Sequence, residues 1–169
     1  MTMKKINAFE QGEAILKTLS KGAFLTTAAD GKVNTMTIGW GSLGFKWGAP
    51  TFTVMVRQSR YTKELIDANG EFTVSFPVNE GFTKAIGLCG TKSGRDMDKL
   101  AAAGLETIAG ETVSVPVIKG CGLHIECKIV EHYTMVPEKF DKALTEKWYG
   151  AGDWHTCYTG IITAAYVEE

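Results

Sequence analysis

The stretch that decides the fold of this chain is residues 33–65, VNTMTIGWGSLGFKWGAPTFTVMVRQSRYTKEL. It predicts a strand, a glycine-rich turn region, a second strand over residues 51–56, and the start of a helix that runs from about Arg60 to Asn69 and ends at Gly70. Thr, Phe, Thr, Val, Met and Val alternate in the second strand, which is typical of a strand with one buried face. A sheet strand that passes directly into a helix is therefore the first structural prediction.

Side chains that favour anions gather at this predicted strand-to-helix junction, namely Arg57, Ser59, Arg60 and Thr62. The first N–H groups of a helix lack internal partners and carry partial positive charge, so helix N-termini bind phosphates. Guanidinium groups strengthen such binding through charge-assisted hydrogen bonds. The pattern predicts a phosphate-bearing ligand at this junction. The alternative is that Ser59 is an ordinary N-cap and the charged residues after it form a solvated helix face.

The composition of the 169-residue chain limits the function classes. Hydrophobic residues make up 44% and charged residues 22%, and the length fits one domain over residues 1–169. The net charge of −1 gives no reason to expect a nucleic-acid groove or an anionic membrane surface. No apolar run approaches the roughly 20 residues that span a bilayer, and the N-terminus lacks the apolar core of a secretory signal. We expect a cytoplasmic protein that binds neither nucleic acid nor membrane.

The rest of the chain predicts mainly strands with helices in the connections. Asp30 and Gly31 mark a hairpin turn between strands over residues 23–29 and 33–40, and Ser93 fits the N-cap of a later helix. The other predicted strands cover residues 71–77, 112–120, 121–135 and 157–169, and the other predicted helices cover residues 8–19, 79–90, 95–103 and 138–150. Six or seven strands in this order favour an antiparallel barrel over a parallel doubly wound sheet.

Two glycine-containing segments qualify the ligand prediction. Residues 39–44, GWGSLG, match the dinucleotide fingerprint G-x-G-x-x-G, but the next residues, FKWGAP, could not start a helix, so we reject a dinucleotide fold. We interpret these glycines as allowing a turn, or the close approach of a flat ligand. Residues 88–96, LCGTKSGRD, predict a loop that could form the other side of the same ligand site. The alternative is a plain connector with a good N-cap.

The cysteines, histidines and tryptophans have no spacing typical of a metal site, and no metal is expected. Cys121 and Cys127 would lie about 20 Å apart on one strand, so they could not form a disulfide with each other, and we expect reduced thiols. His124 and His132 are expected to be structural or exposed, whereas His155 could reach a ligand. The four tryptophans exceed the needs of a small core, and some could lie against a planar ring.

Three motifs in order resemble the flavin reductase family, and within it the flavoredoxin-like branch. They are NTMTIGWG at residues 34–41, V-x-x-S-R-Y-T at 56–62 and C-G-x-x-S-G-R-D-x-D-K at 89–99, followed by H-x-x-x-x-G-x-I at 155–162. The resemblance covers nearly the whole chain. It implies a mainly β, antiparallel Greek-key split β-barrel with helical insertions that binds FMN. It also implies a homodimer with flavin sites near the subunit interface.

The resemblance also implies roles for individual residues. Those bordering the flavin ring would be Thr35, Met36 and Thr37. Those holding the phosphate would be Arg57, Ser59, Arg60 and Thr62. Those closing over the flavin from the second loop would be Cys89, Gly90 and Ser93. His155 would lie on the nicotinamide side and is the one candidate catalytic residue.

The function implied by the resemblance is an FMN-dependent oxidoreductase. Hydride would pass from NAD(P)H to the flavin, and electrons would pass onward to a flavin or a redox-protein acceptor. The sequence shows no recognisable NAD(P) site, so a carrier that receives electrons from a protein stays open. The alternative function is a non-catalytic FMN-binding electron carrier or sensor module.

Overall fold

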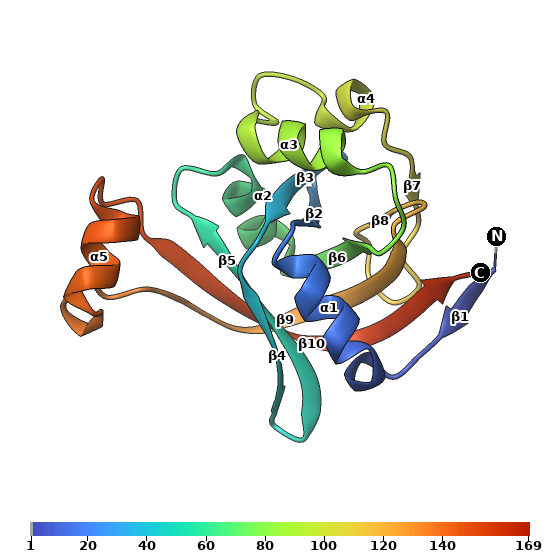
Figure 1. The fold of residues 1–169 in the computed structure, drawn as a ribbon, viewed down its shortest axis with the longest axis horizontal. Helices are drawn as coiled ribbons and strands as arrows, with labels where there is room; N and C mark the ends of the chain where they lie inside the picture. Colours follow the sequence, from blue (N-terminus) through green and yellow to red (C-terminus); the bar gives the residue numbers. More distant parts are fainter. Residues whose placement is uncertain (1) are drawn as a thin grey trace.

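One antiparallel sheet dominates the computed structural model, which describes residues 2–169 (Figure 1). Its strands are β1 Met3–Lys5, β2 Ala23–Ala29, β3 Lys32–Ile38, β4 Gly41–Lys46, β5 Ala49–Arg57, β6 Glu71–Pro77, β9 Gly122–Thr134 and β10 His155–Glu168. They pair in the order β3-β2-β6-β9-β10-β5-β4, and β1 pairs with β10. A separate two-stranded sheet joins β7 Thr107–Ile108 to β8 Val117–Ile118. The predicted mainly β antiparallel fold with helical insertions is confirmed.

The two outer strands of this sheet are neighbours in the chain. Only Gly39 and Trp40 connect β3 to β4, so the end of one strand lies close to the start of the other. Within residues 2–169, however, β3 pairs only with β2 and β4 only with β5. The sheet therefore curves toward closure and stays open between its outer strands, as in a split barrel.

Strand β5 shows how the sheet separates core from site. Phe52, Val54 and Val56 are fully buried in the main hydrophobic cluster. Because successive strand residues point to opposite faces, Met55 and Arg57 lie on the other face. Both of these residues line a cavity.

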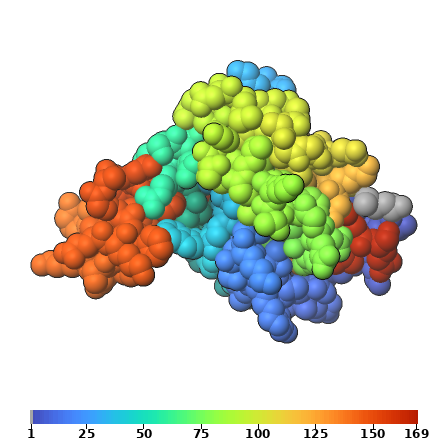
Figure 2. All heavy atoms as spheres, turned by 45° about the horizontal axis from the view of Figure 1, so that its top comes forward, coloured from blue at the N-terminus to red at the C-terminus, as the bar shows by residue number. Residues whose placement is uncertain are grey.

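Helices α1 to α4 lie against the barrel, whereas α5 lies apart from it (Figure 1). The helices are α1 Gly12–Leu19, α2 Tyr61–Asn69, α3 Thr83–Thr91, α4 Lys99–Ala103 and α5 Lys142–Tyr149, with short 3-10 turns at Ala8–Gln11 and Pro137–Lys139. We call residues 135–154, which connect β9 to β10 and contain α5, the arm. Figures 1 and 2 show the arm projecting beside the barrel, in orange. No helix within residues 2–169 has both the length and the apolar character needed to cross a membrane.

Several sequence predictions are confirmed. The hairpin between β2 and β3 turns at Asp30 and Gly31, whose φ angles are 50° and 74°. Helix α2 ends at Gly70, which adopts the left-handed conformation with φ 73°. All four cysteines are free and buried.

The glycine-rich turn predicted over residues 39–44 is wrong. Residues from Gly41 onward form β4, and the chain turns later, at Trp47 and Gly48, both with positive φ. A Cβ atom on Gly41 would lie 2.8 Å from the carbonyl oxygen of Thr53. The glycine therefore serves close strand pairing rather than a turn.

The N-cap predicted at Ser93 is also wrong. Helix α4 begins six residues later, and its N-cap is Asp98, whose carboxylate accepts from the N–H of Ala101 at 3.1 Å. The Ser93 hydroxyl accepts instead from the N–H of Arg95 at 3.2 Å, which makes a local turn. The helix predicted over residues 79–90 is present as α3 Thr83–Thr91, so the start of the loop predicted over residues 88–96 is helical.

The strand predicted over residues 112–120 is reduced to Val117–Ile118. The buried carboxylate of Glu126 accepts from the N–H groups of Glu111 and Thr112, each at 2.7 Å, and from the Tyr166 hydroxyl at 2.7 Å. Backbone donors bound to this carboxylate cannot pair with a neighbouring strand. The helix predicted over residues 138–150 is shorter than expected, and β1 was not predicted at all.

Candidate functional site

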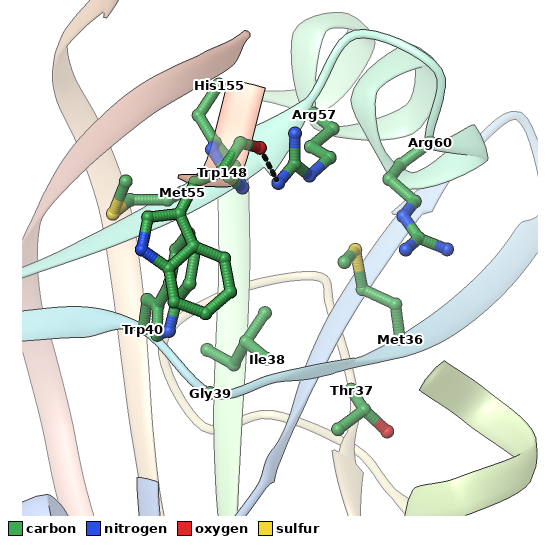
Figure 3. Close-up of a pocket in the computed structure, with 10 residues that line it drawn as sticks. All are labelled: Met36, Thr37, Ile38, Gly39, Trp40, Met55, Arg57, Arg60, Trp148 and His155. Atoms are coloured by element: carbon green, nitrogen blue, oxygen red, sulfur yellow. Dashed lines mark hydrogen bonds between the residues drawn. The ribbon is translucent and has the colours of Figure 1, made fainter. Parts of the chain in front are cut away.

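Two adjoining cavities lie between β3 and the start of α2. The larger, which we call the aromatic pocket, has a volume of about 250 Å³ and is lined by Met36, Thr37, Ile38, Gly39, Trp40, Met55, Arg57, Arg60, Trp148 and His155 (Figure 3). The smaller, the cationic cavity, has a volume of about 120 Å³ and lies between the start of α2 and residues 92–99. Met36 and Arg60 line both cavities. The two cavities therefore form one extended site with an apolar end and a positively charged end.

The aromatic pocket is formed by β3, β5 and the arm. The indole rings of Trp40 and Trp148 meet edge to face, with centroids 4.9 Å apart, and both are about two-fifths exposed. Figure 3 shows Trp148, from the arm, beside Trp40, with Met55 close by. Aromatic rings and polarisable thioethers pack well against flat ring systems.

Arg57 and Ser59, both predicted to bind phosphate, contact the arm in this structure. The Arg57 guanidinium donates to the backbone carbonyls of Asp153 at 2.6 Å and Trp148 at 3.0 Å. The Ser59 hydroxyl and N–H donate to the Asp153 carboxylate at 2.5 and 3.2 Å. These two residues thus attach the arm to the start of α2, and Arg57 does not line the cationic cavity.

Arg60 and Thr62 lie in the cationic cavity, as the phosphate prediction requires. The N-cap of α2 is Arg60, and its side chain makes no capping hydrogen bond in the part of the chain that the structure describes, so the first N–H groups of the helix could bind a ligand. Arg60 reaches toward the Gly90 carbonyl at 3.5 Å. The Thr62 hydroxyl is buried and accepts from the Asn34 side chain at 2.9 Å.

Lys99 is a candidate site residue to which the sequence analysis assigned no role. It lines the cationic cavity, is only 5% exposed, and donates to the Cys89 carbonyl at 3.3 Å. Within residues 2–169 it forms no ion pair. Burial lowers the pKa of Lys99, and the positive charge of Arg60 acts in the same direction. A buried ammonium without a carboxylate is costly unless an anion joins it. The only feature of the sequence that could have pointed to Lys99 is its place at the end of the third motif.

The three predicted β3 residues divide between two environments. Met36 and Thr37 line the aromatic pocket, and the Thr37 hydroxyl donates to the Ile86 carbonyl at 2.6 Å. Thr35 is fully buried, and its hydroxyl donates to the Leu25 carbonyl at 3.3 Å. The side chain of Thr35 therefore belongs to the sheet interior.

Cys89, Gly90 and Ser93 also have different roles. The Cys89 side chain packs in a small apolar cluster, and burial raises the pKa of its thiol, so it is not poised as a nucleophile. A Cβ atom on Gly90 would come 3.3 Å from Cβ of Thr37, so the glycine lets α3 approach β3 closely. Ser93 lines the cationic cavity.

His155, the candidate catalytic residue, lies in the wall of the aromatic pocket. Its Nδ1 atom is 2.7 Å from the hydroxyl of Tyr149, a residue of the arm. Burial and the positive charge of Arg57 lower the pKa of His155 to about 4. The imidazole is therefore neutral at physiological pH.

The site as a whole suits an extended ligand with a flat apolar part and an anionic end. Among residues 2–169, no three His, Cys, Asp or Glu side chains converge in a way that could hold a metal ion. Binding and orientation of a flat anionic molecule is thus the chemistry that the geometry supports.

Two curated relatives are proteins without a described activity. An uncharacterized protein of Archaeoglobus fulgidus is 32% identical over 64% of this chain and 60% of its own length. The uncharacterized protein YddH of Escherichia coli is 29% identical over 71% of this chain and 62% of its own length. The chain therefore spans about three-fifths of the length of these relatives.

Solved structures of the same fold are more informative. A flavoredoxin from Methanosarcina acetivorans is 34% identical, with a TM-score of 0.70 over 88% of this chain and 68% of that one. A flavoredoxin of Desulfovibrio vulgaris is 25% identical, with a TM-score of 0.69 over 88% and 69%. A Shewanella frigidimarina protein described with a split barrel domain is 18% identical, with a TM-score of 0.69 over 97% and 76%, and supports the fold. The model of the flavin reductase like domain matches residues 16–169, and this chain belongs to that family.

Proposed function

We propose that this protein is an FMN-binding oxidoreductase that passes electrons from NAD(P)H through bound FMN to a flavin or a redox-protein acceptor. The observation that carries the proposal is the pair of joined cavities, one aromatic and one cationic, with Arg60 between them. FMN has the matching shape, because a flat tricyclic ring is joined through a sugar alcohol to a phosphate. The flavin reductase like family supports a flavin cofactor, and a similar structure from Thermus thermophilus, 25% identical, is described as an FMN-binding protein.

The residues present fit FMN at both ends. The phosphate would lie in the cationic cavity, where uncapped α2 N–H groups, Arg60 and the unpaired ammonium of Lys99 converge. The ring would lie in the aromatic pocket against Met36 and Trp40. The phosphate would neutralise Lys99, a buried charge that forms no ion pair with any other residue of the described range 2–169.

The chemistry divides between the cofactor and the chain. When bound, FMN supplies hydride acceptance and one- or two-electron transfer. The protein positions the ring and shields it from water with the exposed indoles of Trp40 and Trp148. His155, neutral and hydrogen-bonded to Tyr149, is a polar group in the pocket wall. No charged acid or base needs to act there.

A homodimer and a cytoplasmic location are part of the proposal. The tip of the β4–β5 hairpin exposes Phe45 and Trp47 by 66% and 61%, and Trp40 and Trp148 are exposed at the rim of the pocket. Large exposed aromatic groups of this kind favour an interface with a second copy of the chain. Four free cysteines agree with a reducing compartment.

A second candidate function is a non-catalytic electron carrier. Two of the similar structures are flavoredoxins, and that name favours a carrier. Anaerobic titration of the FMN-loaded protein with NADH and with NADPH, followed at flavin wavelengths, separates the two. Bleaching by a nicotinamide supports the oxidoreductase, whereas a coloured protein that neither nicotinamide bleaches is a carrier or sensor.

The phosphate end has its own test. Arg60→Ala should weaken FMN binding by roughly tenfold or more, because it removes a charge-assisted hydrogen bond. Lys63→Ala is the matched control, since Lys63 lies on the same helix but pairs with Asp67 at 2.6 Å. Equal FMN affinity in the wild type and Arg60→Ala would remove the phosphate assignment.

A further inference from the structure

The hydroxyl of Tyr149, a residue of the arm, faces two possible acceptors at the wall of the aromatic pocket. The Tyr149 hydroxyl lies 2.7 Å from Nδ1 of His155 and 3.4 Å from the sulfur of Met135. Burial raises the pKa of Tyr149, so the phenol keeps its proton at neutral pH. A thioether is a weak acceptor and an imidazole nitrogen is a good one. The shorter contact and the better acceptor both direct the hydroxyl proton to Nδ1.

This direction determines where the imidazole carries its own proton. His155 is neutral, so when Nδ1 accepts from Tyr149 the proton is on Nε2. Within residues 2–169, the only buried side-chain nitrogen or oxygen atoms without a partner are Thr27 Oγ1 and Glu168 Oε2. Nε2 of His155 has no hydrogen-bond partner there either and is not one of these two atoms, so it is not fully buried, and the residue lines the aromatic pocket.

The arm holds Tyr149 rigidly enough for this role. Its ring stacks on Trp154 with centroids 4.2 Å apart and an interplanar angle of 6°, and Phe140 meets it edge to face at 5.4 Å. The Arg57 guanidinium lies over the ring at 5.1 Å and holds the backbone on either side of it. A hydroxyl fixed by this packing can select one tautomer of a neighbouring imidazole.

We propose that Tyr149 is a positioning residue that holds His155 as the neutral Nε2–H tautomer, so that the aromatic pocket offers one uncharged N–H donor to its ligand. The ligand atom suited to this donor is an uncharged acceptor, such as a carbonyl oxygen of a quinone-like electron acceptor. The identification of that ligand rests on the proposed function, whereas the tautomer does not.

Nitrogen NMR of the flavin-free protein tests the positioning role. The chain has three histidines, and His155→Gln identifies the His155 signals by their loss. The wild type should show a protonated Nε2 and an unprotonated Nδ1. Tyr149→Phe keeps the stacked ring and removes only the hydroxyl. It should give a mixture of tautomers and raise the pKa of His155, because the bond that favours the neutral form is lost. The His124 signals should not change.

Two results would overturn the positioning role. One is a wild-type His155 with its proton on Nδ1, which would make Tyr149 the acceptor. The other is a Tyr149→Phe spectrum that matches the wild type. Either result can be read in a folded protein, because the His124 signals report the integrity of the sheet in the same spectrum.

Turnover of the FMN-loaded protein with NADH tests the donor role. Menadione offers carbonyl oxygens, whereas ferricyanide accepts electrons without such a bond. His155→Leu should lower the ratio of the menadione to the ferricyanide kcat/KM about tenfold, the value of one hydrogen bond. His155→Gln, which can place an N–H near the Nε2 position, should keep the ratio within about threefold. His132→Leu, on the exposed part of β9, is the control.

An unchanged ratio in His155→Leu would overturn the donor role. Failure of both NADH and NADPH to reduce either acceptor through FMN in the wild type would instead refute the proposed function. The NMR measurement would still decide whether Tyr149 sets the tautomer.

Discussion

Replacement of Lys99 by Met should change ligand binding and stability in opposite directions. Lys99 is 5% exposed, donates only to the Cys89 carbonyl at 3.3 Å, and forms no ion pair within residues 2–169. Met has a similar length and no charge. In the protein without FMN, the substitution removes a buried cation whose desolvation is poorly compensated, so we expect equal or higher stability.

With FMN, the same substitution removes a charge-assisted bond to the phosphate. Such bonds contribute about 1.5–3 kcal/mol, which corresponds to a roughly ten- to hundredfold weaker Kd. At an FMN concentration of about 100 times the wild-type Kd, bound ligand stabilises the fold by about 2.7 kcal/mol. With a Kd about thirtyfold weaker, the same concentration stabilises Lys99→Met by only about 0.9 kcal/mol.

The assay is urea unfolding with and without FMN, together with a fluorescence titration of the flavin. Lys92→Met is the matched control, because Lys92 lines the same cavity but is exposed and should affect Kd only slightly. A Lys99→Met protein that binds FMN within twofold of the wild type, or that unfolds about 2 kcal/mol more easily without FMN, would refute the reasoning.

The pH dependence of stability independently checks whether the charged Lys99 destabilises the protein without FMN. The folded-state pKa of Lys99 is lowered below the usual 10.5, so the unfolded chain binds a proton more readily than the folded protein does. Stability without FMN should therefore rise with pH between the folded and unfolded pKa values of this group. The stability difference between Lys99→Met and the wild type should narrow over that alkaline range.

Four further substitutions test other parts of the structure. Arg57→Ala should lower the hydrogen-exchange protection of the arm about tenfold while the core is unchanged, because Arg57 holds two arm carbonyls. Glu126→Gln should cost about 2–4 kcal/mol in urea unfolding at neutral pH, since this carboxylate satisfies several buried donors. Because the folded pKa of Glu126 is lowered from 4.5, the wild type should lose this stability as the pH falls through that folded pKa, and the loss should be absent in Glu126→Gln. Gly41→Ala should lower the melting temperature, because its Cβ would overlap the Thr53 carbonyl, whereas Gly87→Ala in α3 meets nothing and should stabilise by about 0.5–1 kcal/mol.

The parts of the fold that could be predicted are those encoded locally. The Asp30–Gly31 turn, the alternation in β5 and the glycine after α2 each depend on a few adjacent residues. The strand predicted over residues 112–120 failed because its backbone donors bind Glu126, a residue of β9 distant in the sequence. Propensity alone could not predict that partner.

The same distinction applies to the site. Arg60 and the uncapped start of α2 were predictable, because helix termini and arginines can be recognised in sequence. Lys99 was not, because a lysine in DMDKL is expected on a solvated face until α4 packs it beside the Cys89 carbonyl. The contacts of Arg57 depend on the arm, which lies about ninety residues later in the chain.

The positions of Asp153 and Lys99 indicate where a phosphate binds more favourably. The Asp153 carboxylate already accepts from Ser59, so one anion position at the start of α2 is occupied by the chain itself. Asp153 and Ser59 are both at least partly exposed, and exposed polar pairs of this kind contribute little to stability, about 0–1 kcal/mol. Lys99, deeper in the cationic cavity, is a buried cation with no anionic partner within residues 2–169. An entering phosphate therefore gains most beside Lys99 and Arg60, and it can bind there while Asp153 continues to hold the arm against the aromatic pocket.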